Sequence, residues 1–192
     1  MPKVVYLTGA PGSGKSSTTR LLAKRMPDLL IWEYGAKLTE HCAARSAEAI
    51  RQDDLRARSA GIVTLDDVEA VDAALLTFID NHRATQNVLI DSHPVTKEEY
   101  GYRITPFSLE QFEQLRPDEI WVLYASPTET RRRIEADPGG RPMVSDEEAR
   151  THTMLQASVA ATYGMAIRCP VYMFDTEGSR NVLVTKLVGR LS

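Results

Sequence analysis

The chain has 192 residues, of which 26% are charged and 43% are apolar, and its formal net charge at pH 7 is −3. This length and balance are typical of one globular domain with a buried core, so we expect a single domain over residues 1–192. The small net charge gives no overall field that would attract a membrane or a polyanion, so we expect no membrane partner and keep nucleic acid only as an alternative acceptor.

The first predicted elements form a phosphate-binding loop. Residues 4–7, "VVYL", are an apolar run of strand length, and residues 16–26 have a helical pattern that Pro27 ends. Between them, "GAPGSGKS" fits G-x-x-x-x-G-K-[ST], the Walker A motif, whose glycines let backbone N–H groups point at an anion. The residues predicted to bind the donor's phosphates are Gly9, Ala10, Pro11, Gly12, Ser13, Gly14, Lys15, Ser16 and Ser17.

Two side chains of this loop have specific predicted roles. Lys15 reaches the β- and γ-phosphates of a bound nucleotide, and the Ser16 hydroxyl is a ligand of Mg²⁺. The start of the following helix adds positive charge to the same site.

Strand-like and helical patterns then alternate to the end of the chain. We predict strands at residues 29–34, 88–93, 120–125 and 171–174, and helices at 35–50, 65–84, 108–115, 127–136, 145–165 and 179–191. With the first strand, this predicts an α/β fold of three layers: a five-stranded parallel sheet with helices on both faces. Ligands bind at the carboxyl ends of such strands, which selects Glu33-Tyr34-Gly35, Asp91-Ser92-His93, Ser126 and Asp175 as candidates.

Asp91 ends the third apolar run, "NVLID". If that strand neighbours the first, its carboxylate lies beside the phosphate-binding loop. It would hold Mg²⁺ through water or accept a proton from an acceptor hydroxyl. An aspartate that only caps a turn is the structural alternative.

An arginine-rich segment follows the fourth strand. "TRRRIEADPGGR" contains Arg131, Arg132, Arg133 and Arg141, and phosphoryl transfer needs positive charge on the transferred group. Consecutive helical residues point about 100° apart, so the first three arginines do not all face one site. The turn-rich stretch around residues 139–140 is a candidate lid, with a plain surface loop as the alternative.

In the order of its motifs, the chain resembles the archaeal-type adenylate kinases, within the P-loop nucleoside monophosphate kinases. The similar segments are "EYGAKLTEHCAA", "RQDDLRA", "LIDSHPV", "EEYGYRITPFSLEQFEQLRPDEIWVLYASP", "RRRIEADPGGRPMVSDEE" and "DTEGS". The resemblance implies a P-loop kinase fold, an acceptor-binding region at about residues 34–86 and a short lid at about 133–146.

The resemblance also implies site residues and substrates. ATP is the phosphoryl donor and Mg²⁺ the cofactor, with Gly178 in the loop near the adenine. The implied catalytic residues are Lys15, Asp91, Arg133 and Arg141, and the implied acceptor-binding residues are Gly35, Arg56, His93 and Arg103. Two positions depart from the family pattern: Pro142-Met143 follow Arg141 where a second arginine is usual, and Arg103 replaces an apolar residue. Both indicate a changed acceptor pocket.

We therefore expect an ATP-dependent kinase that phosphorylates a nucleoside monophosphate, with AMP as the first candidate. One alternative is a P-loop kinase that phosphorylates a hydroxyl on a small metabolite, a nucleoside or a polynucleotide. Another is a nucleotide-binding regulator without transfer activity. A GTPase is disfavoured, because no Asn-Lys-x-Asp guanine-binding motif is present.

Cys42 and Cys169 have neither metal-ligand spacing nor a CxxC partner, and the longest apolar runs have strand length. We expect a cytoplasmic protein with reduced thiols.

Overall fold

A computed structural model describes residues 1–45, 62–137 and 142–192. Two of the predicted site residues, Arg56 and Arg141, lie outside these ranges, as does the end of the helix predicted at residues 35–50.

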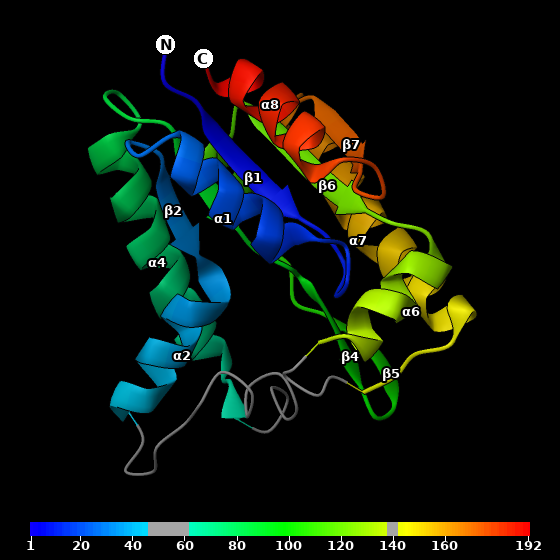
Figure 1. Ribbon diagram of the computed structural model, residues 1–192. Coiled ribbons are helices and arrows are strands. Elements are labelled where there is room, and N and C mark those ends of the chain that lie inside the picture. The colour runs from blue at the N-terminus through cyan, green and yellow to red at the C-terminus, as the bar shows by residue number, and fades with distance from the viewer. Residues whose placement is uncertain (46–61, 138–141) are drawn as a thin grey trace.

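The core of the fold is a five-stranded parallel sheet (Figure 1). Its strands, in spatial order, are β2 (Leu30–Glu33), β3 (Val88–Asp91), β1 (Val4–Thr8), β6 (Glu119–Tyr124) and β7 (Val171–Asp175). β1 lies at the centre, where Leu7 is in register with Asp91 on one side and with Trp121 on the other. The predicted sheet is confirmed, with each strand bounded within two residues of its prediction.

Helices cover both faces of the sheet, which confirms the three-layer prediction (Figure 1). α1 (Lys15–Arg25) and α8 (Arg180–Leu191) pack on one face, and α4 (Leu65–His82), α5 (Leu109–Leu115) and α7 (Asp146–Ile167) pack on the other. α2 (Tyr34–Arg45) and α6 (Pro127–Glu135) lie toward the carboxyl ends of the strands.

Side-chain alternation along the central strand explains this layering. Successive side chains of a strand point to opposite faces, and β1 is apolar at nearly every position. Val4 and Tyr6 belong to the apolar cluster with α4, α5 and α7, whereas Val5 and Leu7 belong to the cluster with α1 and α8. A strand buried on both sides is what the run "VVYL" predicts.

Several helix starts are fixed by local capping. Thr64 caps α4 by accepting a hydrogen bond from the Asp67 amide, and the Asp67 side chain accepts one from the Thr64 amide in return. Ser145 and Glu148 form the same reciprocal pair at the start of α7. These caps place the two helix starts within a residue of their predicted positions.

Within the part of the chain that the structure describes, a two-stranded hairpin was not predicted. β4 (Val95–Glu98) and β5 (Gly101–Ile104) form an antiparallel hairpin directly after the His93 loop. Two side chains of α7 hold it: the His152 Nε2 and the Gln156 Nε2 both donate to the Val95 carbonyl oxygen, at 3.0 and 3.1 Å. Because this support comes from far along the chain, the short polar alternation of residues 95–104 did not indicate it.

Within the described ranges, no helix combines the length and the apolar character that a membrane span requires. Cys42 and Cys169 are both buried free thiols.

Candidate functional site

The loop between β1 and α1 has a backbone that only glycine accommodates at three positions. Gly12 and Gly14 have φ of 80° and 84°, in the left-handed region. At Gly9, a Cβ would lie 2.6 Å from the Leu123 carbonyl oxygen and 2.7 Å from the Ser13 Oγ. The glycines of the predicted phosphate-binding motif are therefore required by this strand–loop–helix geometry.

Lys15 and Asp91 meet beside this loop. The Lys15 Nζ donates a hydrogen bond to the Asp91 Oδ1, and both side chains are largely buried. Asp91 is the last residue of β3, which pairs with β1, so the sheet order brings the carboxylate to the loop as expected. Lys15 and Asp91 thus place a cation beside a carboxylate at the carboxyl edge of β1 and β3.

The oxygen atoms at this edge suit Mg²⁺, which prefers carboxylate, hydroxyl and phosphate oxygens. Ser16 is exposed in the first turn of α1, and Asp91 ends the neighbouring strand. Among the described residues, no cluster of three or more His, Cys, Asp or Glu side chains could hold a metal by itself. The residues present fit a Mg²⁺ ion that is held partly by the phosphates of a bound nucleotide.

Arg133 connects the phosphate-binding loop to the loop after β7. Its Nη1 donates to the Gly12 carbonyl at 3.1 Å and to the Thr176 Oγ1 at 2.8 Å, and its Nη2 donates to the Thr176 carbonyl at 2.8 Å. Its Nε donates to Glu129 at 2.7 Å. A positive charge is therefore held against the backbone that carries the predicted phosphate contacts.

The neighbouring arginines point elsewhere, as the helical spacing predicts. Arg131 pairs with Asp146 at 3.0 Å, and Arg132 pairs with Glu129 on the surface. Hydrogen bonds from Arg132 and Arg133 lower the pKa of the Glu129 carboxyl to about 2, so it stays ionised and keeps both guanidiniums in place.

Thr176 is a contact residue that sequence reasoning missed. It is buried, directly follows β7, and its Oγ1 lies 2.8 Å from the Ser13 carbonyl oxygen and 3.0 Å from that of Tyr124. Its position after a parallel strand was the available signal, since Asp175 was selected for that reason. Gly178 lies in the same loop, and a Cβ there would meet no other atom within 4 Å.

The predicted acceptor-binding residues are more dispersed. Gly35 lies in the first turn of α2, and His93 is exposed between β3 and β4. Arg103 lies on β5, with its Nε 3.8 Å from Glu98. The described residues therefore bring the phosphate-binding loop, Asp91, Arg133 and the loop of Gly178 together, while the acceptor candidates are distributed over α2, the loop after β3 and β5.

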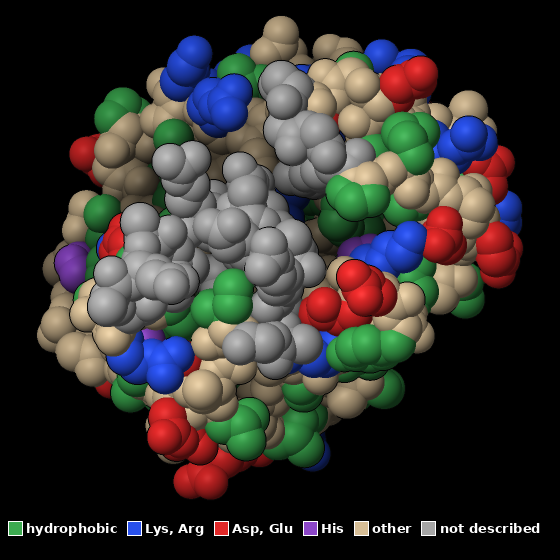
Figure 2. Space-filling model, turned by 90° about the horizontal axis from the view of Figure 1, so that it is seen from below, with side chains coloured by type: hydrophobic (Ala, Val, Ile, Leu, Met, Phe, Trp, Pro, Cys, Tyr) green, Lys and Arg blue, Asp and Glu red, His purple; other side chains and the backbone are tan. Residues whose placement is uncertain are grey.

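The surface view supports a polar rim at this end of the molecule. Figure 2 shows the face seen from below Figure 1, with Lys and Arg side chains at several places near its edge and Asp and Glu side chains between them.

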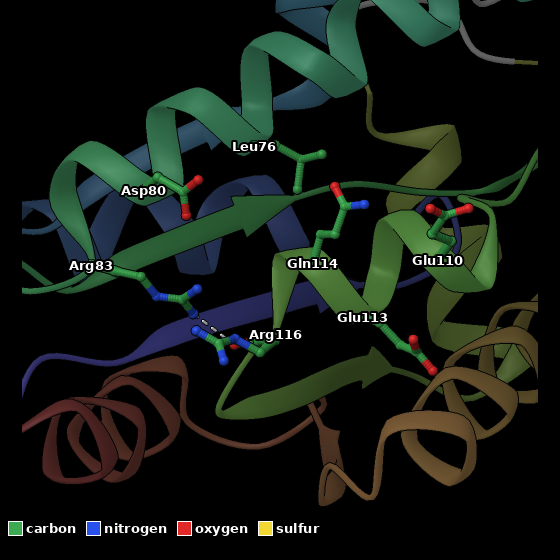
Figure 3. A pocket seen from close by; sticks show the side chains of 7 residues that line it. All are labelled: Leu76, Asp80, Arg83, Glu110, Glu113, Gln114 and Arg116. Atoms are coloured by element: carbon green, nitrogen blue, oxygen red, sulfur yellow. Dashed lines mark hydrogen bonds between the residues drawn. The ribbon is translucent and has the colours of Figure 1, made fainter.

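A separate hollow of about 480 Å³ lies between α4 and α5. Figure 3 shows its seven lining side chains, which are Leu76, Asp80, Arg83, Glu110, Glu113, Gln114 and Arg116. Arg83 crosses it to donate to the Arg116 carbonyl at 2.9 Å. No described residue of the predicted site lines this hollow, so it is distinct from the phosphate-binding end.

Comparison with known proteins gives the same picture. The profile of the family described as "AAA domain" matches residues 8–150, which begins at the phosphate-binding loop and includes Asp91 and Arg133. The adenylate kinase of Thermococcus onnurineus is 29% identical over 167 residues, covering 86% of this chain and 82% of that protein. The adenylate kinase of Pyrococcus furiosus is 27% identical over 168 residues with the same coverage. These relatives confirm the resemblance to archaeal-type adenylate kinases.

Solved structures confirm the fold. Shikimate kinase from Bacteroides thetaiotaomicron superposes with a TM-score of 0.57 at 17% identity, covering 98% of both chains. A sugar kinase from a Janibacter species has a TM-score of 0.56 at 14% identity, covering 98% of this chain and 94% of that one. The P-loop kinase fold predicted from the sequence is therefore correct.

Proposed function

The chain belongs to the AAA domain family, and we propose that it is an ATP-dependent kinase that transfers the γ-phosphoryl group to a nucleoside monophosphate, with AMP as the first candidate. The observation that carries this proposal is the glycine loop before Lys15, set beside Asp91 at the carboxyl edge of a parallel sheet. The likeness to archaeal adenylate kinases supports the choice of acceptor.

Each residue near the loop has a proposed role. Backbone N–H groups of residues 9–17, apart from Pro11, which has none, bind the phosphates of ATP together with the start of α1. The loop of Gly178 lies near its adenine. Lys15 and Arg133 place positive charge where negative charge spreads over the transferred group. Arg141, outside the described ranges, adds a second lid arginine.

Two residues with side-chain oxygen atoms would bind the Mg²⁺ ion. Ser16 would bind Mg²⁺ directly and Asp91 through water, and the ion would supply charge neutralisation at the β- and γ-phosphates. Because a phosphate oxygen attacks a phosphorus atom in line, the reaction needs positioning and charge more than a strong base. A site with a single central carboxylate is sufficient for that chemistry.

The acceptor region at about residues 34–86 and the lid at about 133–146 remain proposals. Arg56 would clamp the acceptor phosphate, and Gly35, His93 and Arg103 would complete the pocket. Guanidinium groups bind phosphates through paired, charge-assisted hydrogen bonds, which suits this assignment.

Steady-state kinetics with ATP and AMP varied separately test the acceptor site. Arg56→Ala should raise the acceptor KM strongly and change the ATP KM little, while Arg58→Ala, two residues along, is the matched control. A rise in the ATP KM alone would place Arg56 on the donor side and contradict this map.

The variant Asp91→Asn distinguishes phosphorylation of a nucleoside monophosphate from phosphorylation of a hydroxyl group. If Asp91 organises Mg²⁺, excess Mg²⁺ should recover part of the lost rate. A loss that persists at saturating Mg²⁺, together with turnover of hydroxyl acceptors, would favour a base at Asp91 and contradict a nucleoside monophosphate as acceptor.

A further inference from the structure

A buried carboxylate lies within the proposed acceptor region. Asp72, in α4, is 3% exposed, and its Oδ1 accepts a hydrogen bond from the Tyr34 hydroxyl at 2.6 Å. Tyr34 is half-buried and directly follows β2, so it lies at the carboxyl edge of the sheet. Among the described residues, no Lys, Arg or His pairs with Asp72.

A row of aromatic rings leads from this pair to the central strand β1. The Tyr34 ring meets the Phe107 ring edge-on at 5.5 Å, and Phe107 in turn contacts Tyr6 at 6.2 Å. The Tyr6 hydroxyl is fully buried and makes no hydrogen bond of ordinary geometry to a described residue. Burial, together with the nearby Tyr163, Asp91 and Asp72, raises its pKa.

The described residues of this cluster are tyrosines and carboxylates. Among the described residues, the titratable groups that interact with the Asp72 charge are Tyr34 from α2, Tyr6 from β1, Tyr163 from α7 and Glu69 from its own helix. Burial, opposed by the Tyr34 hydrogen bond and aided by Glu69, raises the pKa of Asp72 from 3.8 to about 6. A buried carboxylate in such surroundings is costly unless further donors reach the cluster.

The Tyr34 hydroxyl can still accept a hydrogen bond. A phenol both donates and accepts, and donation to a carboxylate strengthens the oxygen as an acceptor. Because Tyr34 is half-buried and Asp72 is buried, a ligand would meet the tyrosine first. The negative charge of Asp72 disfavours a phosphate here, so the uncharged part of a ligand suits this position better.

We propose that Tyr34 is a specificity-determining residue for the acceptor, and that Asp72 is the positioning residue that holds its hydroxyl. The Tyr34 oxygen accepts a hydrogen bond from an N–H or O–H donor in the uncharged part of the acceptor, which is either an exocyclic amine of the base or a sugar hydroxyl. This inference rests on the proposed function, because it takes the acceptor to be a nucleoside monophosphate.

Comparing three acceptors shows whether the group that donates a hydrogen bond to Tyr34 is the exocyclic amine or a sugar hydroxyl. AMP carries both groups, purine riboside 5′-monophosphate lacks the exocyclic amine, and 2′-deoxyAMP lacks one sugar hydroxyl. The wild-type protein should prefer AMP over one of the two analogues by about tenfold in kcat/KM, the value of one well-placed hydrogen bond. Tyr34→Phe should remove most of that preference, while Tyr163→Phe, which removes another hydroxyl of the same aromatic cluster, should preserve it.

Measuring the acceptor KM as a function of pH tests whether Asp72 positions the Tyr34 hydroxyl for the acceptor or only links α4 to α2. The phosphate of AMP also titrates near pH 6 and would change the acceptor KM of both proteins. The acceptor KM of Asp72→Asn is therefore divided by that of the wild type at each pH, so that this common effect cancels. This ratio should exceed one where Asp72 is ionised and fall toward one as the pH drops below about 6, because protonated Asp72 and asparagine are then alike.

The possible failures are distinguishable. If the folded wild-type protein phosphorylates none of the three acceptors, the proposed function fails and the inference fails with it. If the wild type is active but Tyr34→Phe keeps its preference, or the KM ratio is constant with pH, the inference alone is overturned. Thermal unfolding of both variants confirms that the kinetics report folded protein.

Discussion

Replacing Asp72 by asparagine should stabilise the protein at neutral and higher pH. Asparagine has the same shape and still accepts the hydrogen bond from Tyr34, but it removes the buried charge. In the wild type, burial raises the pKa of Asp72 from 3.8 to about 6. A shift of about two pKa units corresponds to about 3 kcal/mol between the two protonation states.

The direction of the pH dependence follows from this raised pKa. The folded protein holds the Asp72 proton more tightly than the unfolded chain does, so this stabilisation is complete below about pH 4 and is lost as the pH rises through about 6. Compared with Asp72→Asn, the wild type should therefore have a free energy of unfolding that is lower by up to about 3 kcal/mol at pH 8 and nearly equal at acid pH.

Urea unfolding of both proteins across this pH range is the assay. Other carboxyl groups, such as Glu129 with its lowered pKa, titrate equally in both proteins, so their contributions cancel in the difference. A variant that is less stable than the wild type at pH 8, or a difference that does not change with pH, would refute the reasoning.

The remaining predictions concern the phosphate-binding loop and the packing of the core. Lys15→Ala should lower kcat by about 10²–10³ with an unchanged circular dichroism spectrum, and near-normal turnover would contradict its assignment. Glu119→Ala should lower the free energy of unfolding by about 3–5 kcal/mol in urea, since the buried carboxylate accepts hydrogen bonds from three donors that would lose their partner. Gly164→Ala should cost about 1–3 kcal/mol in the same assay, because its Cβ would lie 2.3 Å from Val171, whereas Gly189→Ala, which meets no atom within 4 Å, should be neutral or stabilising.

Local patterns were sufficient for most of the fold and for selecting the Walker A loop and Asp91, which the structure brings together. The Walker A spacing is a local signal that predicts a strand–loop–helix junction at Gly9 to Ser16 without information from the rest of the chain. Asp91 could be selected because parallel strands present their carboxyl ends at one edge. The strand order, which puts β3 beside β1, then brings Asp91 to Lys15.

Contacts between distant segments were not accessible in the same way. The hairpin of β4 and β5 depends on His152 and Gln156, which lie 57 and 61 positions after Val95. Asp72 stands between apolar neighbours on the buried side of α4, where a sequence pattern shows only a polar residue in a helix. The proposed role of Asp72 depends on its hydrogen bond with Tyr34, which lies 38 positions earlier in the sequence and is brought to Asp72 only by folding.

The fate of the γ-phosphoryl group tests the central claim most directly. The purified protein is incubated with Mg²⁺, AMP and ATP labelled at the γ-phosphate, and the nucleotides are separated and analysed for the position of the label. We predict that the label moves to the β-phosphate of newly formed ADP, at a rate that depends on AMP and is lost in Lys15→Ala. Label that stays in ATP, or that appears only as inorganic phosphate or on a hydroxyl acceptor, would contradict a nucleoside monophosphate kinase.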